Sequence, residues 1–244
     1  MKFSFNILIT LLFLTIISCS GDDKEPTAVD KFNEAFEILK DKDYFLAAED
    51  FEKVSDEFAF SSLAPRAKML SIYSYYMADE YEEVANSGED FKNLFPSHKY
   101  TPYILYLQGL SYYDQIPQVD RAQDNSRLSS SILRELVALY PDSKYYQDSK
   151  MRIKKIDEFL AASFLSKSRY YMNSEKYVSA IKNLQQVVNR YAHTKSYCEA
   201  NFRMVEIFYK IGVDEQIKPF ARNLKARCQG NVWFDKGQKI ILEM

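Results

Sequence analysis

The cysteine at position 19 is the residue whose surroundings point most directly to chemistry. It follows Ile16-Ile17-Ser18, and Lys2 and an apolar stretch over residues 7–17 precede it. The apolar stretch is shorter than the ~20 residues that a transmembrane helix needs, and it is typical of a secretory signal peptide. Aliphatic residues, a small residue and then cysteine resemble a bacterial lipobox, in which a peptidase cuts before the cysteine and the thiol accepts a diacylglycerol.

The lipobox predicts how the mature chain is attached and where it resides. Residues 1–18 would be a signal peptide, and residues 19–26 would be a lipidated Cys19 and a polar tether. Several acyl chains anchor a protein far more firmly than one. Because Ser20 rather than aspartate follows the cysteine, the pattern favours the outer membrane, with the protein facing the periplasm. The alternative is an ordinary signal peptide with an incidental cysteine.

Cys198 and Cys228 form a second chemically suggestive pair. The pattern predicts a helix over residues 197–211, a turn at 212–214 and a returning helix to about Cys228. Each cysteine lies 15 residues from Val213, so both return to the same end of the hairpin. In an oxidising compartment such a pair tends to form a disulfide. The alternative is two free, buried thiols.

Other residue types with catalytic potential lack the necessary spacing. No two of the six glycines lie within five residues of one another, which excludes a dinucleotide-binding or P-loop motif. His98 and His193 each follow a predicted helix end and do not form a zinc site or protease motif. Carboxylate pairs such as Asp56-Glu57 are typical of solvated helix faces. The sequence therefore predicts a non-enzymatic protein with no metal and no cofactor.

The charge is unevenly distributed along the chain. Residues 22–95 hold eight Lys and Arg against 19 Asp and Glu, a net charge of −11, whereas residues 96–244 hold 23 against 15, a net charge of +8. Two different binding faces would explain this division, and two differently solvated halves are the alternative. The basic residues are dispersed and the whole chain has a net charge of −2, so a nucleic-acid partner is not expected.

A repeated pattern identifies the elements that position these residues. Tyr44, Tyr81 and Tyr177 are each followed by an aromatic residue 14 positions later. Apolar residues at offsets of 3, 7 and 10 from these tyrosines lie on one face of a helix, and another amphipathic helix precedes each tyrosine, over residues 29–39, 67–77 and 161–172. The pattern resembles the tetratricopeptide repeat. It predicts an all-α, superhelical stack of about five helix-turn-helix repeats, with two insertions, that end near Phe58, Phe95, Tyr140, Tyr191 and Cys228.

One stretch is more specific than the general repeat. Residues 106–117 read Tyr-Leu-Gln-Gly-Leu-Ser-Tyr-Tyr-Asp-Gln-Ile-Pro and lead into Asp120-Arg121-Ala122-Gln123. This stretch closely resembles the BamD family, the lipoproteins of the outer-membrane β-barrel assembly machine, although Ala122 replaces the family's usual aspartate. Pro65-Arg66-Ala67, the tyrosines of residues 73–76 and Trp233 extend the resemblance to residues 24–236.

The resemblance implies a scaffold that couples BamA to unfolded outer-membrane proteins during their insertion. It implies that residues 27–143, repeats one to three, face the substrate, that residues 144–236, repeats four and five, dock onto the POTRA domains of BamA, and that residues 237–244 are a tail. A periplasmic tetratricopeptide lipoprotein that serves as an adaptor for cell-envelope machinery is the alternative. A helical-solenoid lytic transglycosylase would need a catalytic domain, for which five repeats leave no room.

The candidate binding residues come from repeat geometry. The first helices of stacked pairs line a concave surface, and seven aromatic and methionine residues occupy the inward positions. Such a stripe suits an apolar or aromatic peptide, although the same residues could be core. They are Phe32, Phe36, Met69, Tyr73, Tyr76, Tyr106 and Tyr113.

Candidate partner contacts lie on the second helix of the fourth repeat. Lys182, Asn183 and Arg190 occupy the region where the BamD family often has Asn-Arg. The order here is Lys-Asn, so Lys182 would stand in for the arginine. Charges in such positions can equally be solvated.

Overall fold

The computed structural model describes residues 25–119 and 123–243, and its regular elements are all helical. The predicted signal peptide, Cys19 and residues 120–122 of the BamD-like loop lie outside this range. The helices follow one another along the chain as α2 Ala28–Lys40, α3 Tyr44–Glu57, α4 Ala64–Met77, α5 Tyr81–Leu94, α6 Thr101–Asp114, α7 Asp124–Leu139, α8 Tyr146–Asn173, α9 Tyr177–Arg190, α10 Ser196–Lys210, the 3₁₀ helix η1 Asp214–Gln216, α11 Ile217–Arg227 and α12 Val232–Leu242.

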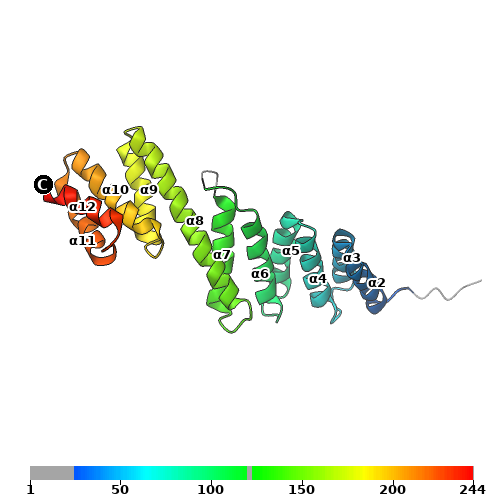
Figure 1. Cartoon of the computed structure of the whole chain (residues 1–244). Coiled ribbons are helices and arrows are strands. Elements are labelled where there is room, and N and C mark those ends of the chain that lie inside the picture. The colour runs from blue at the N-terminus through cyan, green and yellow to red at the C-terminus, as the bar shows by residue number, and fades with distance from the viewer. Residues whose placement is uncertain (1–24, 120–122, 244) are drawn as a thin grey trace, which may run out of the picture.

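Five helix pairs stack into the elongated solenoid that the sequence predicts (Figure 1). The residues at the predicted offsets form its core. Ala47, Phe51 and Val54 are buried after Tyr44, and the equivalent residues after Tyr177 are buried too. The periodicity identifies these residues because the face of a helix that packs against the core carries one continuous apolar stripe.

The turn inside a repeat uses a left-handed residue that need not be glycine. Lys42, Asp79 and Glu175 have φ angles of 64°, 61° and 56°, and each lies just after the first helix of its pair. Gly212 occupies the same place in the fifth pair, with φ 69°. A left-handed residue at this position closes the last turn of the helix, so the repeat keeps the same turn geometry without a glycine pattern.

Helix α8 is longer than the sequence pattern predicts. The expected first helix of repeat four, residues 161–172, is only the end of a continuous helix of 28 residues. In its first half, Ile153 and Ile156 share a buried cluster with Leu133 of α7, and in its second half, Ala161 and Leu165 share one with Ala180 and Leu184 of α9. Near its middle, the buried Asp157 accepts two hydrogen bonds from Arg134 of α7, at 2.8 and 2.7 Å, and lies 2.9 Å from Nε2 of His193. One of the two predicted insertions is therefore additional helix rather than a loop.

The predicted tail is also helical. Residues 237–242 belong to α12, which packs on α10 and α11. The Trp233 ring stacks on Phe202 with 5.4 Å between centroids, and Gly237 permits close packing, because a Cβ there would lie 2.7 Å from Leu224. A terminal helix of this kind covers the apolar end of a solenoid.

Gly109 allows the close approach of α6 and α7. A Cβ at this position would collide with the Leu133 side chain, whose Cγ would be only 2.7 Å away. Ser129 of α7 donates a hydrogen bond to the Gly109 carbonyl oxygen at 2.7 Å. This glycine is thus required for the close packing of the two helices.

The fifth repeat contains a disulfide. A disulfide joins Cys198 of α10 to Cys228 at the end of α11, with 5.7 Å between Cα atoms. Within the described part of the chain, no helix combines the length and the apolar character needed to cross a membrane.

Candidate peptide-binding and partner-binding surfaces

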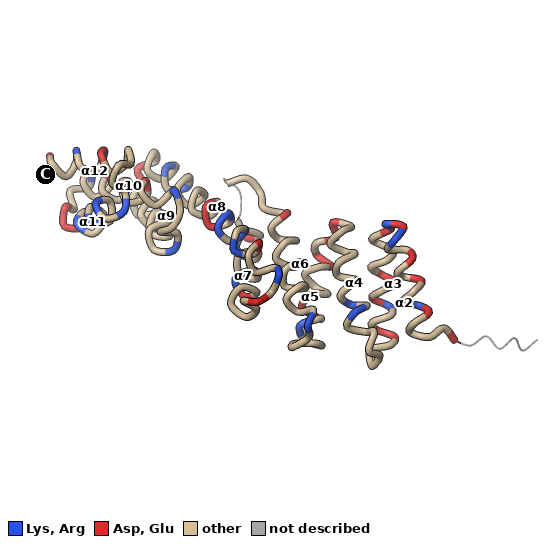
Figure 2. Tube along the Cα trace, turned by 60° about the horizontal axis from the view of Figure 1, so that its bottom comes forward, with Lys and Arg blue, Asp and Glu red and all other residues tan. Residues whose placement is uncertain are grey.

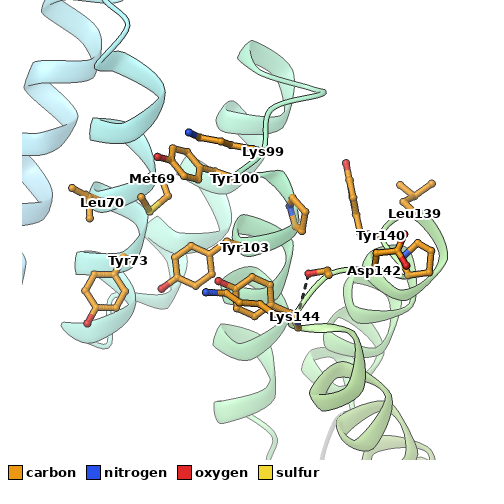
Figure 3. Close-up of a pocket in the computed structure, with 14 residues that line it drawn as sticks. Met69, Leu70, Tyr73, Lys99, Tyr100, Tyr103, Leu139, Tyr140, Asp142 and Lys144 are labelled. Carbon is orange, nitrogen blue, oxygen red and sulfur yellow. Dashed lines mark hydrogen bonds between the residues drawn. The ribbon is translucent and has the colours of Figure 1, made fainter.

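A groove of about 1010 Å³ lies where the second and third repeats meet the start of α8 (Figure 3). Helices α4 and α6 form one wall, and the turn between α7 and α8 forms the other. The lining is mainly aromatic and aliphatic. The aromatic groove, as we call it, is lined by Met69, Leu70, Tyr73, Lys99, Tyr100, Pro102, Tyr103, Leu139, Tyr140, Pro141, Asp142, Ser143, Lys144 and Tyr145.

Stacked tyrosines give this groove its shape and its chemistry. The rings of Tyr103 and Tyr145 stack with 5.2 Å between centroids. Burial, with smaller contributions from neighbouring tyrosines, raises the pKa of Tyr103, so its hydroxyl stays protonated at neutral pH. The ammonium groups of Lys99 and Lys144 lie 5.2 and 5.0 Å from the rings of Tyr100 and Tyr145. An apolar surface with cations beside it suits an extended, aromatic-rich peptide segment that carries a negative charge.

Two of the seven predicted peptide-binding residues, Met69 and Tyr73, line the aromatic groove. Sequence reasoning missed Tyr100, Tyr140 and Tyr145 because they lie in or beside turns rather than on a helical stripe. It also missed Tyr103, which lies on α6 three residues before the predicted Tyr106. The signal available was the proline that follows Tyr140, which marks the turn that forms one wall.

Phe32 and Phe36 belong to the first repeat and lie outside the groove. Phe32 is only 6% exposed, and its ring packs edge-on against Phe51 at 5.3 Å. Its burial favours the alternative that it is a core residue, and its role as a peptide contact stays a prediction. Phe36 is half-buried and stacks on Phe32 at 6.4 Å, and the Lys40 ammonium group lies 5.2 Å from the centroid of its ring.

Tyr76, Tyr106 and Tyr113 form a separate polar cluster behind Tyr145. Tyr76 donates a hydrogen bond to Asp114 and Tyr106 donates one to Asp148, both at 2.7 Å. Burial and these hydrogen bonds raise the pKa of both phenols. Arg152 pairs with Asp148 at 2.5 Å and covers the Tyr113 ring at 4.8 Å. The Tyr76 and Tyr106 hydroxyls are thus engaged within the chain. The Tyr106 ring supports the groove by stacking on Tyr145 at 4.7 Å.

The structure brings Lys182, Asn183 and Arg190 together in a shallow hollow of about 480 Å³, which also includes Arg127 of α7. Lys182 and Arg190 are exposed, whereas the Asn183 amide donates a hydrogen bond to the Ser179 carbonyl oxygen of its own helix at 2.8 Å. Three cations beside one another favour an acidic partner.

Acidic and basic residues separate along the solenoid, as the sequence indicates. Figure 2 shows acidic residues concentrated over α2 to α5, and basic residues more frequent from α7 onward. The aromatic groove lies near the boundary, whereas the hollow around Lys182 lies in the basic half. Among the described residues, no group of three His, Cys, Asp or Glu side chains could hold a metal ion.

Comparison with known proteins places these surfaces in context. Residues 24–222 match the model of the YfiO family, described as outer membrane lipoprotein. The chain is 28% identical to the outer membrane protein assembly factor BamD of Rickettsia prowazekii, over 91% of this chain and 88% of the relative. It is 25% identical to BamD of Caulobacter vibrioides, over 96% and 79%, and 28% identical to BamD of Neisseria meningitidis serogroup B, over 73% and 70%.

Proposed function

Because this chain belongs to the YfiO family of outer-membrane lipoproteins, we propose that it is a lipid-anchored scaffold for the assembly of outer-membrane β-barrel proteins. Repeats one to three, residues 27–143, receive unfolded barrel proteins, and repeats four and five, residues 144–236, dock onto BamA. The scaffold binds its partners without catalysing a reaction. The observation that carries this function is the match over residues 24–222 to a family whose curated relatives are named as assembly factors.

The aromatic groove supplies a site for the unfolded substrate. A barrel protein in transit exposes strand segments in which apolar and polar side chains alternate. The tyrosines can pack against the apolar side chains of such a segment and donate hydrogen bonds to its unpaired carbonyl groups. Lys99 and Lys144 beside the groove can pair with a carboxylate.

The first test concerns the anchor. Cys19→Ser removes the thiol that accepts the diacylglycerol, so the variant should leave the outer-membrane fraction and retain its signal peptide or appear soluble in the periplasm. Envelope fractionation and intact-mass spectrometry of the wild type check this. A wild-type chain without added lipid mass, or a Cys19→Ser chain that remains in the outer membrane at full strength, would contradict the anchor.

The second test concerns the groove. Tyr73→Ala combined with Tyr103→Ala removes two rings from the apolar surface, so cross-linking to a peptide from an outer-membrane protein should fall about tenfold or more, if each ring contributes ~1 kcal/mol. The matched control is Tyr170→Ala, because Tyr170 is an exposed tyrosine on α8 far from the groove. Capture of BamA from solubilised outer membrane should not change in either variant.

The third test concerns the hollow around Lys182, where the opposite effects on peptide cross-linking and BamA capture are expected. Lys182→Glu with Arg190→Glu should weaken BamA capture and leave peptide cross-linking intact, and capture by the wild type should weaken as salt is raised. If peptide cross-linking and BamA capture were both lost in the double tyrosine variant and in the Lys182→Glu, Arg190→Glu variant, the two halves would not have separate binding roles. If the captured proteins were cell-wall enzymes and included no barrel assembly protein, the adaptor alternative would replace the proposed function.

A further inference from the structure

Three inter-repeat turns and the start of α2 lie along one edge of the solenoid, the lower edge in Figure 1. Lys31 of α2 pairs with Glu57 at the end of α3, which places the start of the described chain beside the turn over residues 58–63. Ser62 in this turn shares a small hollow with His98 of the next turn, over residues 95–100. The aromatic groove then joins that turn to the third, residues 140–145. We call these segments the tether edge.

Large apolar side chains project from the tether edge into solvent. Phe60 has a relative exposure of 107%, and Leu94, Leu139 and Val29 are 64, 61 and 54% exposed. None of the four is at a repeat position that closes a helix pair, which is the role of Phe58 and Phe95. Leu139 lines the aromatic groove, and the other three side chains add apolar surface to the same edge, which is unfavourable in water unless another surface covers it.

The opposite edge also carries exposed apolar side chains beside its turns, with Val178 83% and Phe45 47% exposed, but most of its turns differ in composition. Three of its turns, at residues 41–43, 78–80 and 174–176, carry Asp41, Lys42, Asp43, Asp79, Glu80, Glu175 and Lys176, whereas the turn after α6 begins with the uncharged residues 115–119. By contrast, the turn at residues 58–63 reads Phe-Ala-Phe-Ser-Ser-Leu and has no charge, and those at 95–100 and 140–145 carry aromatic residues with Lys99, Asp142 and Lys144. Aromatic residues accompanied by lysine are characteristic of membrane–water interfaces.

The short connection to Cys19 restricts what can lie beside this edge. Only six peptide units separate Cys19 from Glu25, the first described residue. At ~3.5 Å per residue they span at most about 20 Å. A bilayer that holds the acyl chains on Cys19 therefore lies within this distance of the start of α2, and the tether edge is the edge that begins there.

We propose that the tether edge rests on the lipid surface in which Cys19 is anchored, with the Phe60 ring in the boundary between headgroups and acyl chains. The proposal rests on the lipid anchor of the proposed function. It also gives the solenoid a defined orientation: the aromatic groove, lined by two turns of this edge, lies next to the bilayer, and the charged turns face away from it.

Tryptophan fluorescence can locate the edge. The lipidated mature chain is placed in vesicles of phosphatidylethanolamine and phosphatidylglycerol with brominated acyl chains, which quench tryptophan. Trp233→Phe first removes the natural fluorophore. In this background Phe60→Trp should lose most of its fluorescence and shift to the blue. The matched control is Phe45→Trp, a half-exposed phenylalanine near the opposite edge, at the start of α3, and it should keep its fluorescence.

A second measurement does not depend on the anchor. Without lipid, the Cys19→Ser chain should retain weak sedimentation with the same vesicles, and Phe60→Ser with Leu139→Ser should abolish it. If the tryptophan fluorescence of a lipidated, vesicle-bound Phe60→Trp chain is not quenched, the proposal is overturned and the proposed function remains intact. This result is expected if a protein, rather than lipid, covers the tether edge. Equal quenching of both variants also overturns it. A chain without lipid overturns the anchor and this proposal together.

Discussion

Glu52→Gln should lower the free energy of unfolding by about 3–5 kcal/mol, the cost of leaving a buried charge without its partner. Lys68 of α4 is only 5% exposed, and its ammonium group lies 2.6 Å from the Glu52 carboxylate of α3. Tyr75 and Ser87 donate to the same carboxylate at 2.8 and 3.2 Å. One side chain therefore links α3, α4 and α5, and its neutral replacement leaves the Lys68 charge uncompensated.

The same carboxylate predicts a dependence on pH. Burial alone would raise the pKa of Glu52, but the hydrogen bonds from Lys68, Tyr75 and Ser87 and the Lys68 charge outweigh it and lower the pKa below its usual 4.5. The stabilisation is present above the unfolded-state pKa and is lost as pH falls through the lower folded-state pKa. Urea denaturation between pH 7 and 3 should therefore show a steeper loss of stability in the wild type than in Glu52→Gln.

Two further variants test the cause. Glu37 pairs with Lys40 on the exposed surface of α2, so Glu37→Gln should change stability by less than about 1 kcal/mol. Glu52→Leu with Lys68→Met replaces both charges by apolar groups and should recover much of the loss. A Glu52→Gln chain as stable as Glu37→Gln would show that water or another group compensates Lys68.

Reduction of the Cys198–Cys228 disulfide should have the second large effect. The bridge separates the cysteines by 30 positions in sequence. Closing a loop of this length stabilises the folded state by about 3–4 kcal/mol in the chain-entropy account. Because the fifth repeat has a full neighbour on only one side, the loss should be concentrated there as local unfolding of α10 to α12.

Denaturation with and without reductant measures this effect. The matched control is Cys198→Ala with Cys228→Ala, whose stability should equal that of the reduced wild type and should not respond to reductant. Alkylation of the denatured wild type without reductant should add no mass at these two positions. Two added alkyl groups would show that the bridge does not form in the periplasm.

The repeats were predictable because their signals are local. Tyr44, Ala47 and Phe51 report one helix face whatever surrounds them, and the 14-residue interval follows from the length of the second helix. The extent of α8 was not predictable in this way. Its first half, from Tyr146, has a neighbour on only one face, so its apolar pattern is too sparse to distinguish an added helical segment from a loop.

The aromatic groove shows a different limit of sequence reasoning. Tyr73 was predicted because it follows the helical stripe of α4. Tyr100 and Tyr145 lie at the starts of later helices, and only the superhelical stacking brings them opposite Tyr73. Phe32 shares the same stripe pattern but packs on Phe51 in the first repeat. Periodicity shows which face of a helix carries the apolar residues. The position of the helix in the stack decides whether other helices bury that face or leave it open to a ligand.

The continuous helix α8 restricts how the length of this chain can vary. Its 28 residues make a rod of about 42 Å whose two halves share one ladder of backbone hydrogen bonds. Inserting one residue at its centre would rotate the C-terminal repeats by about 100° and advance them by ~1.5 Å. Seven residues would restore the phase to within about 20°. Insertions and deletions within α8 should thus be tolerated in steps of about seven residues, or about two helical turns.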